Sequence, residues 1–276
     1  MTSSSDVPKP SRLRRLRRLL APLVRRVIPS RLPMRGPYNS YGAALADATG
    51  YDSPVVATQV EAATRAVLEG RAVYERDGTT FSERPDLAIH RVLRQVVTPN
   101  ATIADFGGGL GGLFISTQDH VPPGCRLLVI EQASMVEAGR RLAREHRLLL
   151  EFVDSREQAL PPIDVLILSS VLQYLPDPWA TLECLLLQTS PAIVILDRTT
   201  IRRGGSRWYL QTNPGYYTEA VTYPVQVLDR RRLLNSFSGY RLEQSWHNSF
   251  DAGRPEHIGM LLLREPGPVV ASGGRQ

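Results

Sequence analysis

Between residues 105 and 112 the chain reads Asp-Phe-Gly-Gly-Gly-Leu-Gly-Gly, directly after the apolar stretch Thr102–Ala104. An apolar strand that ends in a carboxylate and a glycine-rich turn brings the backbone into contact with a bound nucleotide, because glycine has no side chain at its Cα. This run therefore predicts a site for a nucleotide-type cofactor.

The run satisfies two different cofactor fingerprints. Gly107, Gly109 and Gly112 fit the dinucleotide pattern G-x-G-x-x-G, and Glu131 follows at about the distance expected of a ribose-binding acid. The segment from Asp105 to Gly111 fits the pattern acid-x-G-x-G-x-G, which is typical of S-adenosylmethionine sites. The glycines alone do not decide between a dehydrogenase and a protein that binds an adenosyl sulfonium.

Three features favour S-adenosylmethionine. Lys9 is the only lysine in the chain, which excludes a P-loop and any dehydrogenase chemistry that needs a catalytic lysine. Asp105 would repel a pyrophosphate at the turn, whereas it can accept a hydrogen bond from the cationic methionine end of S-adenosylmethionine. The third feature is the apolar stretch Ile163–Ser169, which runs into a loop that reads Leu-Gln-Tyr-Leu-Pro-Asp-Pro over residues 172–178.

That loop resembles the fourth-strand loop of class I S-adenosylmethionine-dependent methyltransferases, which commonly has His where this chain has Gln173. Four segments are similar, more narrowly, to a bacterial family of methyltransferases with uncharacterised substrates: Tyr38–Tyr51, Tyr74–Gly78, Asp105–Gly111 and Leu196–Thr199. The similarity covers roughly residues 37–264. These motifs are fairly specific for the cofactor and say almost nothing about the acceptor.

The elements that must position these residues follow from hydrophobic patterning. Apolar strand-like runs alternate with helical segments, which predicts right-handed βαβ units and a mostly parallel sheet. The resemblance implies a Rossmann-like α/β fold with seven strands, an antiparallel last strand and a helical N-terminal cap. The predicted strands are 102–106, 126–131, 148–153, 163–169, 192–197, 240–247 and 258–264. The predicted helices are 41–48, 54–69, 86–97, 133–147 and 179–188, with a turn over 70–81 and a linker over 29–41.

The predicted organisation has four parts: a basic, flexible arm (1–36), a helical cap (37–98), a cofactor-binding core (99–266) and a flexible tail (267–276). Residues 200–227 are too long for an ordinary connection, and we expect them to form a lid or an acceptor pocket. This segment is rich in tyrosine and arginine, which suit a sugar or an anionic or aromatic acceptor.

In parallel sheets of this kind, ligands bind outside the carboxyl ends of the strands. The resemblance implies that Gly107, Gly108, Gly109 and Gly111 approach the cofactor and that Glu131 accepts hydrogen bonds from its ribose hydroxyls. Further strand-end residues would flank the adenine (Gln132), receive its amino group (Asp154, with Ser155 beside it) and face the methionine portion (Ser169, Ser170). Each carboxylate also has a structural explanation, as a helix cap or a turn residue.

The function predicted from these residues is methyl transfer from S-adenosylmethionine to the oxygen or nitrogen of a small molecule or saccharide. The alternatives are an NAD(P)-dependent oxidoreductase and an inactive adenosyl-binding protein. Asp197 and His247 are the candidate general bases, and an antiparallel last strand would bring His257 to the same edge. Asp197 could instead pair with Arg198 or Arg202. A cationic methyl donor needs no metal, and no metal-ligand spacing is visible.

The net charge of +6 is unevenly distributed. Residues 1–35 hold ten basic side chains and one acidic one, so the rest of the chain has a net charge of −3, the difference between +6 and +9. An acidic core disfavours a nucleic-acid partner. Residues 11–28 form a basic amphipathic pattern that allows peripheral contact with an anionic membrane. With two distant cysteines and neither a secretory nor a membrane-spanning pattern, we expect a cytoplasmic protein that can associate with a membrane surface.

Overall fold

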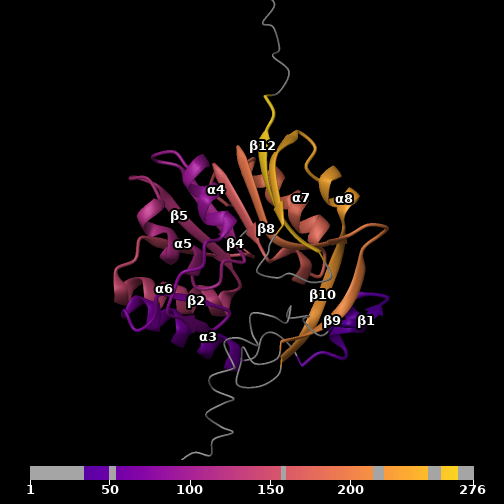
Figure 1. Ribbon diagram of the computed structural model, residues 1–276, viewed down its shortest axis with the longest axis horizontal. Coiled ribbons are helices and arrows are strands. Elements are labelled where there is room, and N and C mark those ends of the chain that lie inside the picture. Colours follow the sequence, from indigo (N-terminus) through magenta and orange to yellow (C-terminus); the bar gives the residue numbers. More distant parts are fainter. Residues whose placement is uncertain (1–33, 50–53, 157–159, 214–220, 248–255, 267–276) are drawn as a thin grey trace, which may run out of the picture.

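The structure is a computed structural model in which the described residues are 34–49, 54–156, 160–213, 221–247 and 256–266. One mixed sheet runs through its centre, and helices cover both faces (Figure 1). The predicted amphipathic segment 11–28 and the tail 267–276 lie outside the described residues.

The seven predicted core strands are confirmed, in the spatial order β6-β5-β4-β7-β8-β12-β11. β6, β5, β4, β7 and β8 are mutually parallel, and β12 is antiparallel to both of its neighbours. The strands are β4 (Thr102–Phe106), β5 (Arg126–Glu131), β6 (Leu150–Asp154), β7 (Val165–Ser169), β8 (Ile193–Arg202), β11 (Tyr240–His247) and β12 (Glu256–Arg264). Because the chain winds outward from β4 in both directions, the topological switch point lies between β4 and β7.

Helices pack on the two faces in a way that follows from residue alternation along the strands. Ile103 packs with apolar side chains of α4 (Ala88–Val96), α5 (Gly112–Thr117) and α6 (Ala133–His146). The next residue, Ala104, packs on the other face with α7 (Pro178–Thr189) and with Leu233 of α8 (Arg230–Asn235). Two short 3₁₀ helices, η1 (Gln118–His120) and η2 (Leu172–Tyr174), complete the core. The buried sheet thus has a separate hydrophobic layer on each side.

All three helices predicted for the cap segment 37–98 are present: α2 (Tyr41–Leu45), α3 (Pro54–Leu68) and α4, which packs on the core sheet. The predicted turn over 70–81 is instead a hairpin of β2 (Tyr74–Arg76) and β3 (Thr79–Phe81). Asp77 and Gly78 join its strands with φ angles of +50° and +75°. Asp-Gly is a favoured pair for such a left-handed two-residue loop, so the sequence carried a hairpin signal that the turn prediction did not use.

Three further strands correct the prediction of a linker over 29–41 and give strand structure to part of 200–227, the segment expected to form a lid or an acceptor pocket. β1 (Met34–Tyr38) pairs antiparallel with β9 (Arg207–Asn213), and β9 pairs antiparallel with β10 (Val221–Asp229). β10 then joins the core sheet through Leu228 and Asp229, which lie beside the end of β8. The segment is therefore a sheet extension, with buried side chains that include Leu210 and Val225, and residues 214–220 lie outside the described part.

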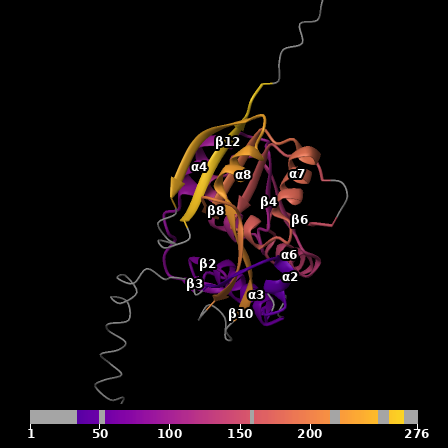
Figure 2. The same cartoon turned by 90° about the vertical axis from the view of Figure 1, so that its right-hand side faces the viewer.

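The cap and the sheet extension meet over the carboxyl end of the core. A hydrophobic cluster joins Val60 of α3, Leu110 of the glycine run, Met135 of α6 and Tyr223 of β10. In Figure 2, α2, α3, β2, β3 and β10 gather at the same end of the molecule. Among the described residues, no helix is both long and apolar enough to cross a membrane.

Candidate functional site

A cavity of about 600 Å³ lies at the carboxyl ends of β4, β5, β7 and β8. The cap covers it on one side, through residues of α2, α3 and the β2–β3 hairpin, and the sheet extension contributes residues of β9 and β10. The cavity therefore coincides with the switch point of the sheet, which is where doubly wound folds bind their ligands.

The glycine run forms one wall of this cavity, as predicted. Gly107 and Gly109 have φ angles of +75° and +59°, which other residues adopt only with strain. A Cβ on Gly107 would overlap the side chain of Val171, whereas a Cβ on Gly109 would meet nothing within 4 Å. The turn therefore presents bare backbone to the cavity, and a ligand can approach it closely.

Asp105 lies under this turn with 3% of its surface exposed. Its Oδ2 would be 2.7 Å from a Cβ on Gly108, so the missing side chain makes room for the carboxylate. Its Oδ1 has no hydrogen-bond partner among the described residues. Burial raises the pKa of Asp105 to about 7. A buried acceptor atom without a donor, on the wall of a cavity, is complementary to a cationic or hydrogen-bond-donating ligand.

Glu131 ends β5 and also lines the cavity. Its Oε1 accepts a hydrogen bond from the backbone N–H of Gly109 at 3.2 Å, and its Oε2 accepts one from the N–H of Gln132 at 2.8 Å. Gln132 and Ser155 are part of the same wall. The predicted ribose-binding acid thus stands directly against the glycine run, with both carboxylate oxygens bound to backbone N–H groups.

Asp154 is placed differently from the prediction. Its carboxylate does not line the cavity but forms a bidentate ion pair with Arg156, at 2.6 Å and 2.9 Å. The hydrogen bonds from the Arg156 side chain and backbone hold the pKa of Asp154 at about 2. A carboxylate engaged in this way does not support the predicted contact with an adenine amino group.

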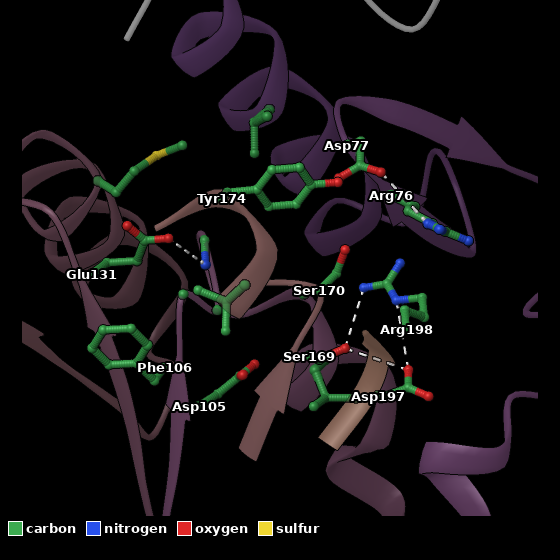
Figure 3. Close-up of a pocket in the computed structure, with 18 of the residues that line it drawn as sticks. Arg76, Asp77, Asp105, Phe106, Glu131, Ser169, Ser170, Tyr174, Asp197 and Arg198 are labelled. Atoms are coloured by element: carbon green, nitrogen blue, oxygen red, sulfur yellow. Dashed lines mark hydrogen bonds and ion pairs between the residues drawn. The ribbon is translucent and has the colours of Figure 1, made fainter. Parts of the chain in front are cut away.

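The opposite wall of the cavity is formed by the ends of β7 and β8 (Figure 3). Asp197 and Arg198 together oppose the single residue Gly259 of β12, which is the pattern of a β-bulge. Arg198 has a φ angle of +49°, a strained conformation for a residue with a side chain. Its guanidinium Nη2 donates a hydrogen bond to Ser169 Oγ at 3.3 Å. The bulge places both charged side chains on the cavity wall.

The Asp197 carboxylate is held from two sides. Trp246 of β11 donates its indole N–H to Oδ1 at 2.9 Å, and Ser169 lies 3.4 Å from Oδ2. A Cβ on Gly259 would overlap Trp246, so this glycine admits the indole ring. Burial raises the pKa of Asp197, and the nearby Arg198 guanidinium opposes that rise. Asp197 is therefore a buried, oriented carboxylate at the site.

His247 does not belong to the cavity. Its imidazole is 78% exposed and lies 3.2 Å from Glu256 across the β11–β12 hairpin. β11 is the outermost strand of the core order, so its carboxyl end is remote from the switch point. Of the two histidines predicted at this edge, only His257 lines the cavity. Of the two residues predicted as the general base, Asp197 and His247, the structure brings only Asp197 to the cavity.

The sequence analysis missed the contribution of the hairpin. Tyr74, Glu75, Arg76 and Asp77 all line the cavity, although their segment was only part of the family resemblance and received no role. Burial raises the pKa of Glu75 to about 7. Two features of the sequence could have indicated these residues. Charged side chains precede the Asp-Gly turn, and the large aromatic Tyr74 stands directly beside them, which is not expected of a loop that only faces solvent.

Aromatic side chains close the wall formed by β7 and β8. Tyr174 of η2 packs edge-on against Tyr223 of β10, with ring centroids 5.4 Å apart. Tyr223 accepts a hydrogen bond from Gln211 at 2.8 Å, and the Tyr174 hydroxyl points toward Asp77 (Figure 3). The arginines of residues 200–227, which we expected to contact an acceptor, do not line the cavity. Arg202, for example, donates hydrogen bonds to the carbonyls of Gly204 and Gly205.

Over the part of the chain that is described, no group of three or more His, Cys, Asp or Glu side chains could hold a metal ion. The charged residues of the cavity are mainly acidic: Glu75, Asp77, Asp105, Glu131 and Asp197 line it together with only two arginines, Arg76 and Arg198. Such a set suits a ligand that is cationic or rich in hydroxyl groups.

No protein-family model matches the sequence, and no curated protein matches it either. Among solved structures, the chain is similar to the glycopeptide N-methyltransferase MtfA complexed with (S)-adenosyl-L-methionine, at 16% identity and a TM-score of 0.47, over 65% of this chain and 87% of that one. It is also similar to the 1,6-didemethyltoxoflavin-N1-methyltransferase of Burkholderia thailandensis, at 14% identity and a TM-score of 0.48, over 87% and 98% of the two chains. The N-terminal domain of EvdMO1, crystallised in the presence of SAH and D-fucose, is similar at 15% identity and a TM-score of 0.45, over 75% and 96%.

Proposed function

We propose that this protein transfers a methyl group from S-adenosylmethionine to an oxygen or nitrogen atom of a small molecule or saccharide. One observation carries the proposal: a cavity at the switch point is lined by bare glycine backbone, by the buried Asp105 and by Glu131. A dinucleotide would have to place its pyrophosphate at this turn, close to the Asp105 carboxyl, whose ionised form would repel it.

The residues present fit the proposed cofactor. Gly107 and Gly109 would admit it against the turn, and Glu131 would exchange its hydrogen bonds to backbone N–H groups for the ribose hydroxyls. The unpartnered Oδ1 of Asp105 would face the cationic side of the ligand. When bound, the sulfonium supplies an electrophilic methyl group. The protein must then align the acceptor and remove its proton.

Asp197 is the group that we assign to proton removal. Its carboxylate is oriented by Trp246 and Ser169, and burial raises its pKa, which makes it a stronger base than an exposed aspartate. Arg198, with Nε 3.6 Å from Asp197 Oδ2, offsets the charge of the carboxylate in the absence of an acceptor.

The acceptor would occupy the part of the cavity between Ser170, Tyr174, Arg198 and Gln211. A total volume of about 600 Å³ has room beside a cofactor for a small molecule. Aromatic faces and a mixture of carboxylates and guanidinium groups are the partners that a hydroxylated ring uses for stacking and hydrogen bonds. These features support a sugar or another compact polar acceptor.

Calorimetric titration of the purified protein with S-adenosylhomocysteine and with NADH tests the cofactor. We expect saturable micromolar binding of S-adenosylhomocysteine and none of NADH. Binding of NADH alone would replace the proposal with an oxidoreductase. Failure of both ligands to bind at high micromolar concentration would indicate a protein that has the fold without the cofactor.

A further inference from the structure

Glu75 reaches the cavity from the β2–β3 hairpin and lies against the end of the glycine run. Its Oε1 would be 2.5 Å from a Cβ on Gly112, the first residue of α5. Only a glycine at this position leaves room for the carboxyl group, so the close approach depends on two segments that are far apart in the sequence. A side chain at Gly112 would therefore have to displace the Glu75 carboxyl from its present position.

The other oxygen of Glu75 is unused. Oε2 is buried and has no hydrogen-bond partner among the described residues, and Glu75 forms no ion pair there. The groups that act on the pKa of its carboxyl are Asp77 and the backbone N–H of Gly78, both on the same hairpin, and Arg198 on β8. A buried acceptor atom without a donor is unfavourable in the protein alone, so its presence on the cavity wall points to a donor supplied by a ligand.

The position of this acceptor indicates which part of a ligand it would meet. Glu75 stands at the α5 end of the glycine run, whereas the ribose-binding candidate Glu131 contacts the run at Gly109. If the ribose lies at Glu131, an amino-acid portion that extends along the run toward Gly112 would reach Glu75, whereas one that extends toward Ser169 and Ser170 on the opposite wall would not. The donor that such a portion offers to a carboxylate is its α-ammonium group.

We propose that Glu75 is a cofactor-binding residue that receives the α-ammonium group of the S-adenosylmethionine amino-acid portion through its free Oε2. This inference rests on the proposed function, because it assumes an adenosyl ligand. It makes the cap a part of the cofactor site, because Glu75 of the hairpin would hold the cofactor together with the glycine run.

The test is a cycle of two ligands and two proteins. The ligands are S-adenosylhomocysteine and the analogue that lacks only its α-amino group; the proteins are the full chain and Glu75→Gln, compared by calorimetry. In the wild type, loss of the amino group should weaken binding about 10- to 100-fold, since a hydrogen bond to a charged partner is lost. In Glu75→Gln, the two ligands should bind with affinities that differ by less than about threefold.

Equal weakening of both ligands by Glu75→Gln would overturn the inference, because Glu75 would then act on the hairpin or on another part of the ligand. Equal affinity of the wild type for the two ligands would also overturn it, while the cofactor proposal would stand. A wild type that binds neither ligand would refute the cofactor proposal itself.

Two further variants keep the test decisive. Glu83→Gln removes an exposed carboxylate of the cap outside the cavity, and both ligands should bind it as they bind the wild type. Gly112→Ala should displace the Glu75 carboxyl without changing that residue, and should reduce the preference for the amino-bearing ligand. Glu75→Gln should unfold at the same temperature as the wild type or a higher one, because it removes a buried ionisable group; a lower temperature would indicate a structural role.

Discussion

The two walls of the cavity are built in different ways. The wall formed by Asp105–Leu110 and Glu131–Gln132 comes from one strand-turn-helix-strand segment of the chain. The wall that faces it combines β7, η2 and the bulge of β8 with residues of β9 and β10. The first wall presents mainly backbone and two carboxylates, whereas the second presents side chains held by long-range contacts, such as Trp246 on Asp197.

This difference separates two functions. A wall of bare backbone fits one type of ligand closely and tolerates few changes, because its shape is set by φ angles and by the absence of side chains. A wall of assembled side chains can change its specificity by substitution while the sheet remains intact. We therefore assign the cofactor to the first wall and the acceptor chemistry to the second, and each prediction below tests that division.

The largest effect is expected on the assembled wall. Asp197→Asn should reduce methyl transfer about 10²- to 10⁴-fold, since an amide cannot accept the proton of the acceptor. Its affinity for S-adenosylhomocysteine should change less than about threefold, which calorimetry can show. Transfer is followed as release of S-adenosylhomocysteine in the presence of an acceptor found by screening sugars, aminosugars and small phenols.

His247→Ala is the matched control, because His247 is exposed and outside the cavity. Its turnover should equal that of the wild type. A loss of turnover in His247→Ala together with a fully active Asp197→Asn would reverse the assignment of the base.

On the first wall, Gly107→Ala should lower the free energy of unfolding by about 2–4 kcal/mol and weaken S-adenosylhomocysteine binding more than about 100-fold. The new Cβ would overlap Val171, and the alanine would have to adopt a φ of +75°. Denaturant titration and calorimetry measure the two effects.

Gly70→Ala is the control that introduces backbone strain without steric overlap of the new Cβ. Gly70 has a φ of +73°, nothing lies within 4 Å of its Cβ position, and it is outside the cavity. This variant should lose only about 1 kcal/mol and should keep its ligand affinity. If both variants bound S-adenosylhomocysteine equally well, close backbone approach at Gly107 would not be part of the site.

The stability of the protein should fall with rising pH because of Asp105. Burial raises its folded-state pKa to about 7, from an unfolded value of 3.8. Its favourable contribution is therefore complete below about pH 4, declines above it and is lost once the pH passes 7. We expect the free energy of unfolding to drop by about 2 kcal/mol between about pH 5 and pH 8, and Asp105→Asn to remove that part of the drop. An unchanged pH profile in Asp105→Asn would show that this carboxyl is ionised in the folded protein.

The smallest effects are expected from two acids at neighbouring strand ends, Glu131 and Asp154. Glu131→Gln should weaken S-adenosylhomocysteine binding about 10-fold, because a charge-assisted contact to the ribose hydroxyls is lost. Asp154→Asn should change it less than about twofold, since Arg156 already occupies that carboxylate. Calorimetry on the two variants decides the order, and a stronger effect from Asp154 would restore the predicted adenine contact.

Much of the fold could be predicted because its signals are local. The strands β4 and β5 read as apolar runs ending in acids, and the helices α3 and α6 show apolar stripes, so their bounds agree with prediction to within two residues. The strands β1, β9 and β10 were missed because their segments contain the proline, glycine and arginine residues of linkers and loops. Their strand state depends on pairing with one another and with β8, which is a non-local interaction.

The sequence by itself determined the glycine run, the order of acids at the strand ends and hence the cofactor wall, because a turn and its flanking strands are coded by adjacent residues. Only the tertiary structure decided which of the candidate residues face the cavity. Asp197 lines it, whereas Asp154 and His247 do not, and Glu75 of the cap lies against Gly112. These placements depend on local ion pairs, on a single-residue bulge and on contacts between distant segments. None of these features can be recognised from a periodicity or a residue spacing in the sequence.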